Sequence, residues 1–447
     1  MTSGTLQREL EEGLSELPII DAHTHLIGDE LGARGLHEIL LYHMVISDLY
    51  GAGVPSGRRL TEFPGQPDTA EAHFRIQEAL PYLPHIRNTA MFWLTKVILK
   101  DLYGWDQPIT ADNWRKLDDL IRERAQDVAW HHSVLDRVHI KRTCAEYARR
   151  GTGASDDRLQ YSLEWGFFTR SQWGEYDTAL YELERCWGKQ PAGSVPIGTG
   201  PRPATERTIR SVADVHAAVD WYVKTIPYHH LVSMATHLST DIDFSVISES
   251  QMAAALARRE QAGLAERSIY AGYVNEVFLT ALEAHADELV FQFSFGAEPL
   301  PFESGARLNQ QTIGQVADMI ARHPKLRFQC FLASRHANQS LCTMARELPN
   351  FSLAGYWWHN FFPTAISQLM DERLDMVAAN KQVGFFSDAY CVEWTYGKWV
   401  LVRQLLAGAL AARVERGQYS KDDALAVARA ILYDSPQTLL GLKPRAE

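Results

Sequence analysis

Eight short apolar runs, separated by stretches with helical character, constrain the fold of this 447-residue chain more than any other feature. The runs are apolar on both faces, which is typical of strands buried between a helix layer and a barrel interior. They are residues 17–23, 136–144, 161–169, 229–237, 288–296, 325–333, 351–359 and 383–389. Strands that alternate with helices form parallel β/α units, so eight of them predict an α/β fold, a (β/α)8 barrel of the TIM type. The alternative, a doubly wound open sheet, normally needs fewer strands.

Two stretches of the sequence are too long to be simple connections. Residues 27–135, between the first two predicted strands, are rich in helix-forming and aromatic residues. We predict that they form an inserted, mainly helical cap subdomain over the barrel mouth, because a loop of this length is uncommon. The barrel would then comprise residues 1–26 and 136–447. A second insertion, roughly residues 171–210, contains many Pro and Gly residues and indicates irregular structure.

The charge balance limits the partners of the protein. Lys and Arg number 44 against 55 Asp and Glu, which gives a formal net charge of −11 at pH 7. The basic residues form no stripe that could follow a phosphate backbone, so we expect neither nucleic acid nor an anionic membrane surface as a partner. An uncharged apolar window of about 18 residues is missing, so we also expect no membrane span.

The cysteines and the N-terminal segment indicate the compartment. The five cysteines are widely spaced and form no CxxC pair, which predicts neither a disulfide framework nor a thiolate zinc site. The N-terminal segment is acidic and lacks the apolar core of a signal peptide. We therefore expect a reduced, cytoplasmic protein. Separately, we expect it to assemble as a homo-oligomer.

Ionisable residues gather at the predicted C-terminal strand ends, where β/α barrels carry their catalytic groups. The sharpest pattern is DAHTHL (21–26), in which His23 and His25 project from the same face of the first strand. Asp388 ends the last strand, which neighbours the first in a closed barrel. Two imidazoles and one carboxylate make an open three-ligand site, so we predict one divalent metal ion, zinc before manganese or iron. A chain with 17 histidines also holds some such pairs by chance.

Other polar residues at the predicted strand ends are candidates for substrate binding. Arg170 and Arg335 can hold a carboxylate bidentately, although each can equally form an ordinary surface ion pair. His237 and His359 end the fourth and seventh predicted strands. A structural role is the simpler interpretation for at least one of these two histidines.

These residues resemble the amidohydrolase superfamily and, within it, the uronate isomerase family (glucuronate or galacturonate isomerase). The DAHTHL strand end, the aspartate of FFSDAY and the barrel layout are similar to the superfamily. The segments YHMVISDLYGAGVP (42–55) and AGYWWHN (354–360), together with the helical insertion, are similar to the uronate isomerases. The resemblance covers nearly the whole chain.

The resemblance implies roles for individual residues. It implies that His23, His25 and Asp388 are metal ligands. It also implies that His43 reaches from the insertion into the active site to help bind the substrate. Arg170 falls where the family has an arginine after its third strand, which suits a contact with the substrate carboxylate.

The sequence departs from the family at several positions. The family follows its strand-8 aspartate with Ser-Arg, whereas this chain has Ala389 and Tyr390. The family has a tyrosine after the insertion histidine His43, where this chain has Met44. Ser294 stands where the fifth strand of the family carries a histidine. The metal group is therefore retained, while several residues that handle substrate or protons are replaced.

Three classes of function fit these residues. A uronate isomerase-like enzyme would move a proton from C2 to C1 of a small sugar acid, with Asp388 as base and with His43 and Tyr390 as further catalytic groups. A metal-dependent hydrolase, lyase or decarboxylase acting on a small carboxylated substrate is the second class, since the same ligands can activate water. A non-catalytic binding protein on an inherited barrel is the third. The complete metal group argues against the third class.

Overall fold

The computed structural model contains eight parallel strands in one sheet, whose order follows the sequence from first to last. The structure describes residues 3–28, 30–55, 69–151, 158–165, 178–189, 204–237, 244–295, 310–332, 335–357 and 361–443. The strands are β1 (Ile19–Thr24), β2 (Ile140–Glu146), β3 (Leu159–Glu164), β4 (Leu231–His237), β5 (Val290–Phe295), β6 (Arg327–Leu332), β7 (Phe351–Ala354) and β8 (Gln382–Val383). Each predicted apolar run overlaps one of these strands, so the TIM-type barrel fold is confirmed.

The first and last strands meet through the segment that follows β8. The Asp388 amide donates to the His23 carbonyl at 2.9 Å, and the His25 amide donates to the Ala389 carbonyl at 2.9 Å. These two bonds continue a strand-like ladder between the end of β1 and residues 388–389. The seam of the barrel therefore runs through the residues that sequence patterns single out as metal ligands.

Buried amides connect strands across the barrel interior. Gln292 on β5 donates to Gln329 Oε1 on β6 at 2.9 Å and to the Ala22 carbonyl on β1 at 3.2 Å. Ser233 on β4 donates to Gln292 Oε1 at 2.9 Å. Because each of these polar groups finds a partner, the barrel can hold them without the cost of an unpaired buried amide.

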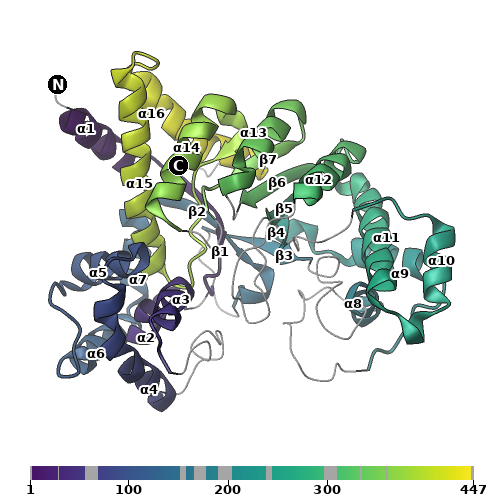
Figure 1. Cartoon of the computed structure of the whole chain (residues 1–447), viewed down its shortest axis with the longest axis horizontal. Coiled ribbons are helices and arrows are strands. Elements are labelled where there is room, and N and C mark those ends of the chain that lie inside the picture. The colour runs from purple at the N-terminus through teal and green to yellow at the C-terminus, as the bar shows by residue number, and fades with distance from the viewer. Residues whose placement is uncertain are drawn as a thin grey trace.

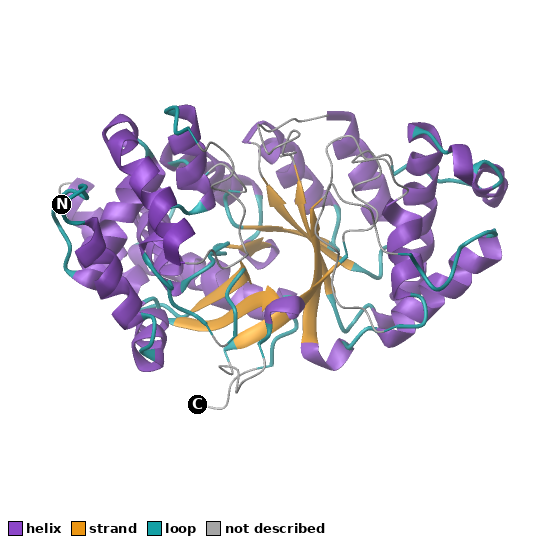
Figure 2. Ribbon diagram, turned by 90° about the horizontal axis from the view of Figure 1, so that it is seen from below, coloured by secondary structure: helices purple, strands orange, loops and turns teal. Residues whose placement is uncertain are grey.

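Helices surround the sheet, as Figures 1 and 2 show. Outside the region between β1 and β2, the α-helices are α1 (Ser3–Ser15), α8 (Thr178–Cys186), α9 (Val212–Thr225), α10 (Glu249–Leu256), α11 (Leu264–Leu282), α12 (Gln310–Arg322), α13 (Asn338–Glu347), α14 (Pro363–Met376), α15 (Val392–Glu415), α16 (Lys421–Arg429) and α17 (Ser435–Leu439). Several start at a serine cap. In α9 and α16 the side chains of Ser211 and Ser420 accept from the amide three residues on, and an aspartate there completes a capping box. Among the described residues, no helix is long and apolar enough to cross a membrane.

In the described residues between β1 and β2, six α-helices are present, and they group together in Figure 1. They are α2 (Leu36–Leu40), α3 (His43–Gly51), α4 (Thr69–Ala79), α5 (Ala90–Tyr103), α6 (Trp114–Arg124) and α7 (Val128–Arg137). Helices α5 and α7 pack against α15 of the barrel. The division into a cap, residues 27–135, and a barrel, residues 1–26 and 136–447, stays a prediction. The predicted insertion at 171–210 lies partly outside the described residues.

Candidate metal centre

Three side chains from the two sides of the barrel seam converge. His25 Nε2 lies 3.1 Å and His23 Nε2 lies 3.8 Å from Asp388 Oδ1. One ligand atom from each residue lies within 4.8 Å of the other two. An ion with bonds of about 2.1 Å in tetrahedral geometry places its ligand atoms roughly 3.4 Å apart, so small side-chain adjustments suffice. The group could therefore bind a metal ion, and its identity as zinc, manganese or iron stays a prediction.

Asp388 holds its position through an unusual backbone conformation. Its φ is +51°, in the left-handed region that residues other than glycine rarely adopt and that aspartate tolerates better than most. Its amide bonds to the His23 carbonyl, and its own carbonyl accepts from Tyr42 Oη at 2.6 Å and from Lys398 Nζ at 3.4 Å. Groups from β1, from the helical insertion and from α15 thus fix this one residue. Such strain persists where surrounding contacts over-determine it, which is common at functional sites.

The two carboxylate oxygens of Asp388 face different partners. Oδ1 faces His23 and His25, whereas Oδ2 lies 3.7 Å from Lys398 Nζ and 3.8 Å from His43 Nε2. Burial by itself would raise the pKa of Asp388, but Lys398 and His25 hold that pKa well below its usual range. Asp388 is therefore ionised at neutral pH, as a metal ligand must be.

Glu146, the last residue of β2, is a member of the site that the sequence prediction missed. Its Oε1 lies 2.8 Å from His25 Nδ1, which leaves Nε2 of His25 for the shared centre. Carboxylates commonly orient metal-bound histidines in this way. The predicted second strand ended at residue 144, two residues before the end of β2. A strand prediction extended by one side-chain period would have placed Glu146 at the rim.

The two histidines differ in their protonation. Burial and the nearby charge of His25 lower the pKa of His23 to about 4. Burial by itself would also lower the pKa of His25, but Glu146 and Asp388 raise it to about 9. His23 is thus a neutral donor at physiological pH, while the two carboxylates make the position of His25 favourable for a cation.

Tyr42 and Lys398 are two further residues that the sequence prediction missed. Lys398 on α15 is fully buried, and its Nζ donates to Tyr42 Oη at 2.7 Å. Burial lowers the pKa of Lys398 to about 8, although Asp388 acts in the opposite direction. The sequence feature that could have revealed this contact is the lysine inside the apolar stretch WTYGKWVLV. A lysine that is buried with such a stretch needs a polar partner.

Comparisons with solved structures add to this geometry. The chain matches the uronate isomerase of Thermotoga maritima with a TM-score of 0.77 and 13% sequence identity, over 98% of this chain and 97% of that one. It matches the glucuronate isomerase of Caulobacter crescentus with a TM-score of 0.77 and 14% identity, over 100% and 95% of the two chains. The uronate isomerase of Bacillus halodurans matches with a TM-score of 0.70 and 14% identity, over 99% and 98%. The chain has the fold of the uronate isomerases.

The uronate isomerase fold confirms the resemblance inferred from the sequence. These matches cover almost the full length of both chains, so the likeness includes the helical insertion as well as the barrel. At 13–14% identity they show the fold alone. No protein-family model matches the chain, and no curated protein matches its sequence.

Two predicted catalytic residues lie beside the metal group of this uronate isomerase fold. His43 opens α3, and its Nε2 lies 3.8 Å from Asp388 Oδ2. The ring of Tyr390 stacks on the ring of His25, with centroids 4.6 Å apart. Tyr390 also meets the ring of His43 edge to face, with centroids 5.7 Å apart. The structure therefore brings both residues to the centre, and their catalytic roles stay predictions.

The predicted substrate-binding residues are less well placed or lie outside the described residues. Arg170 and His359 belong to the undescribed residues, and so does the side chain of His237, whose backbone ends β4. Arg335 is exposed and opens the short 3-10 helix η8 (Arg335–Ala337) after β6. Within the described part of the chain, no hydrogen bond or ion pair joins Arg335 to the metal group.

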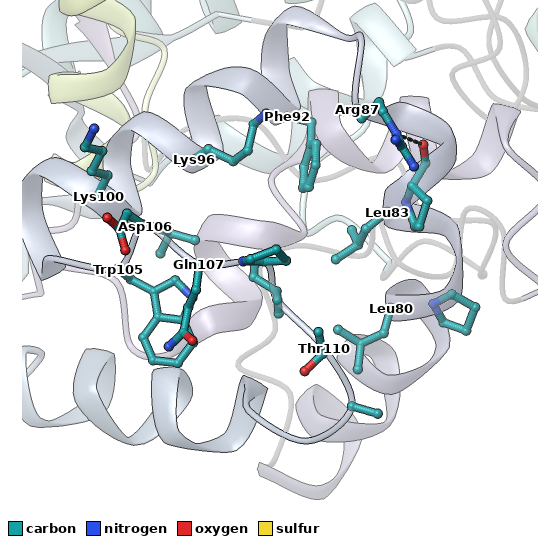
Figure 3. Close-up of a pocket in the computed structure, with 16 residues that line it drawn as sticks. Leu80, Leu83, Arg87, Phe92, Lys96, Lys100, Trp105, Asp106, Gln107 and Thr110 are labelled. Atoms are coloured by element: carbon teal, nitrogen blue, oxygen red, sulfur yellow. Dashed lines mark hydrogen bonds between the residues drawn. The ribbon is translucent and has the colours of Figure 1, made fainter.

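A separate hollow lies in the helical insertion of the uronate isomerase fold (Figure 3). Its volume is about 850 Å³, and it lies between η2 (Leu80–Ile86), α5 and residues 105–111. Phe92 and Trp105 are among its apolar walls, with Lys96 and Lys100 beside them. It includes none of the metal-group residues, so we assign the chemistry to the barrel seam instead.

Proposed function

We propose that the protein is a metal-dependent isomerase of a small sugar acid, which converts an open-chain aldose acid to the ketose acid. The observation that carries the proposal is the division of Asp388 between two tasks. Oδ1 faces the histidine pair, and Oδ2 faces His43 from the helical insertion. The Asp388 carboxylate thereby serves both as a metal ligand, through Oδ1, and as the partner of His43 in proton transfer, through Oδ2. The three structural relatives, which are uronate and glucuronate isomerases, agree with this chemistry.

The reaction requires a proton to leave C2 and a proton to arrive at C1. A divalent ion held by His23, His25 and Asp388 would polarise the oxygens on C1 and C2. Asp388 Oδ2 takes the proton from C2, and the electrons of the C2–H bond form the C1=C2 bond of an enediol. His43 donates a proton to the oxygen on C1. The return of the proton from Asp388 to C1, with loss of the proton on the C2 oxygen to His43, completes the ketose and restores both side chains.

The position of each group suits these steps. Asp388 is ionised, because its pKa is held below its usual range despite burial. His43 is partly exposed, with 22% of its side-chain surface accessible, so it can reach both Asp388 and a ligand. Tyr390 covers one face of His25, and its hydroxyl is proposed to donate to an enediolate oxygen. The other proposed substrate-binding residues remain Arg170, Arg335, His237 and His359.

The test is an assay of metal-loaded protein on a panel of uronates, aldonates and their lactones. An isomerase yields a product of unchanged mass, whereas hydrolysis adds the mass of one water. The Asp388→Asn variant serves as the control and is expected to be inactive. A product with added water would overturn the proposal in favour of a metal-dependent hydrolase. Isomerisation that persists in the Asp388→Asn protein would overturn the mechanism.

A further inference from the structure

A sugar acid needs a cation for its carboxylate, and the barrel rim offers one that the sequence patterns did not single out. We propose that Arg149 binds the carboxylate of the substrate. This inference rests on the proposed function, because it concerns the substrate class of the same site. Arg149 ends the short 3-10 helix η3 (Tyr147–Arg149), which directly follows β2. Because β1 and β2 are parallel, η3 lies at the same end of the barrel as His23 and His25.

Two contacts fix the guanidinium of Arg149 beside the metal group. Its Nε donates to Glu146 Oε2 at 2.5 Å, while Oε1 of the same carboxylate lies 2.8 Å from His25 Nδ1. Since one carboxylate joins both residues, Arg149 Nε lies within about 8 Å of His25 Nδ1. The guanidinium carbon also lies 5.3 Å from the centre of the Tyr390 ring, which stacks on His25.

The terminal nitrogens of Arg149 are available to a ligand. Within the described part of the chain, Nη1 and Nη2 of Arg149 have no hydrogen-bond partner, and 18% of the side-chain surface is accessible. An arginine that is held through Nε and through its face keeps the edge formed by Nη1 and Nη2 open. That edge carries parallel N–H groups, and it matches the two oxygens of a carboxylate.

The distance between the metal group and Arg149 suits a short polyhydroxylated acid. An extended six-carbon chain spans roughly 6 Å between its terminal carbons, at about 1.2 Å per bond. Its carbonyl end can thus lie at the metal group while its carboxylate reaches Arg149. A monocarboxylate with an apolar chain would fit the same cation but would place no oxygens at the metal group.

The local charges also favour this assignment. A protein with a net charge of −11 repels anions at long range and needs a fixed cation at the site. The guanidinium of Arg149 on η3 lies over the Tyr390 ring and supplies such a cation beside the metal group. Arg335 is exposed, and no contact among the described residues links it to the metal group.

The test compares acids with their neutral counterparts in direct binding to zinc-loaded protein. Gluconate and glucitol form one pair, since they are open-chain molecules that differ in the terminal carboxylate, and glucuronate and glucose form another. Dissociation constants are measured by calorimetry for the wild type and for Arg149→Gln, Arg149→Lys and Arg150→Gln. Arg150 is the matched control, because it is exposed and its guanidinium lies over Tyr147, 4.3 Å from the ring centre.

We expect Arg149→Gln to weaken binding of the acids about 10- to 100-fold, the usual range for a lost hydrogen bond to a charged group. Binding of glucitol and glucose stays unchanged, Arg149→Lys recovers part of the loss, and Arg150→Gln has no effect. Equal weakening of acids and neutral sugars, with lower zinc content, would show that Arg149 acts only through Glu146 and would overturn the proposal. A wild type that does not prefer the acids would overturn it as well.

The same measurements separate this inference from the proposed function. Acid binding that depends on Arg149, without any isomerisation, would refute the isomerase proposal and support the carboxylate site. Isomerisation of a sugar acid with an unchanged KM in Arg149→Gln would support the isomerase proposal and refute the role of Arg149.

Discussion

Replacement of Glu146 by glutamine is expected to weaken metal binding while the barrel remains folded. Glu146 Oε1 lies 2.8 Å from His25 Nδ1, so its charge fixes the direction of that imidazole. Against the effect of burial, Glu146 and Asp388 raise the pKa of His25 from 6.5 to about 9. At about 1.4 kcal/mol per pKa unit, this rise corresponds to roughly 3 to 4 kcal/mol in favour of a positive charge at His25.

Burial opposes this rise, so the two carboxylates together supply at least this much, and the loss of one charge is expected to cost on the order of 2 kcal/mol, roughly 30-fold in affinity for a cation. The loss of the orienting hydrogen bond adds to this value. Removal of a carboxylate that orients a metal-bound histidine typically weakens metal binding 10- to 100-fold. We therefore expect the zinc dissociation constant of Glu146→Gln to rise by a factor within this range.

The assay is competition for zinc with a chromogenic chelator at fixed pH. Glu123→Gln is the control, because Glu123 is exposed on α6 and the substitution changes the net charge by the same amount. Thermal unfolding of the metal-free proteins establishes that each variant is folded. An unchanged zinc affinity in a folded Glu146→Gln protein would refute the role assigned to Glu146.

Three further predictions concern the same end of the barrel. Tyr42→Phe removes the 2.6 Å hydrogen bond to the Asp388 carbonyl, so the free energy of unfolding in urea should fall by about 1–3 kcal/mol. An unchanged free energy of unfolding would show that this bond does not anchor the left-handed backbone of Asp388. Gly355→Ala should destabilise the barrel by at least about 2 kcal/mol, because Gly355 has a φ of +56° and a Cβ there would lie 2.1 Å from the Phe386 ring; a variant as stable as the wild type would contradict this. Since Tyr390 replaces an arginine of the resembled family, glucuronate and galacturonate should be poor substrates in a kinetic assay; fast turnover of either would show that this replacement matters little.

The strand order is predictable from the sequence because seven strands follow clear runs that are apolar on both faces. The last strand is the exception, since residues 383–389 were predicted as a strand and β8 is only Gln382–Val383. The Gly384 amide bonds to the Ile431 carbonyl at 2.6 Å and thereby leaves the ladder. At the rim, Asp388 itself adopts a left-handed backbone conformation, a feature that no periodicity predicts.

Some contacts of the candidate site are predictable from the sequence, and others are not. The pair His23 and His25 is visible in the sequence, because two residues on one strand share a face. The contact between Lys398 and Tyr42 joins positions 356 residues apart, and its geometry depends on how α15 packs against the helical insertion. Glu146 lies between these cases, since a more accurate strand end would have revealed it.

The seam between β1 and the segment after β8 has a consequence for the order of events during synthesis. His23 and His25 leave the ribosome before Asp388, which follows 363 residues after His25. At about 5–20 residues per second, that interval lasts roughly 20 to 70 s. During that interval a nascent chain carries both histidines of the proposed metal group without the carboxylate that completes it. Binding of a metal ion by His23, His25 and Asp388 together would therefore have to wait until the segment after β8 has emerged.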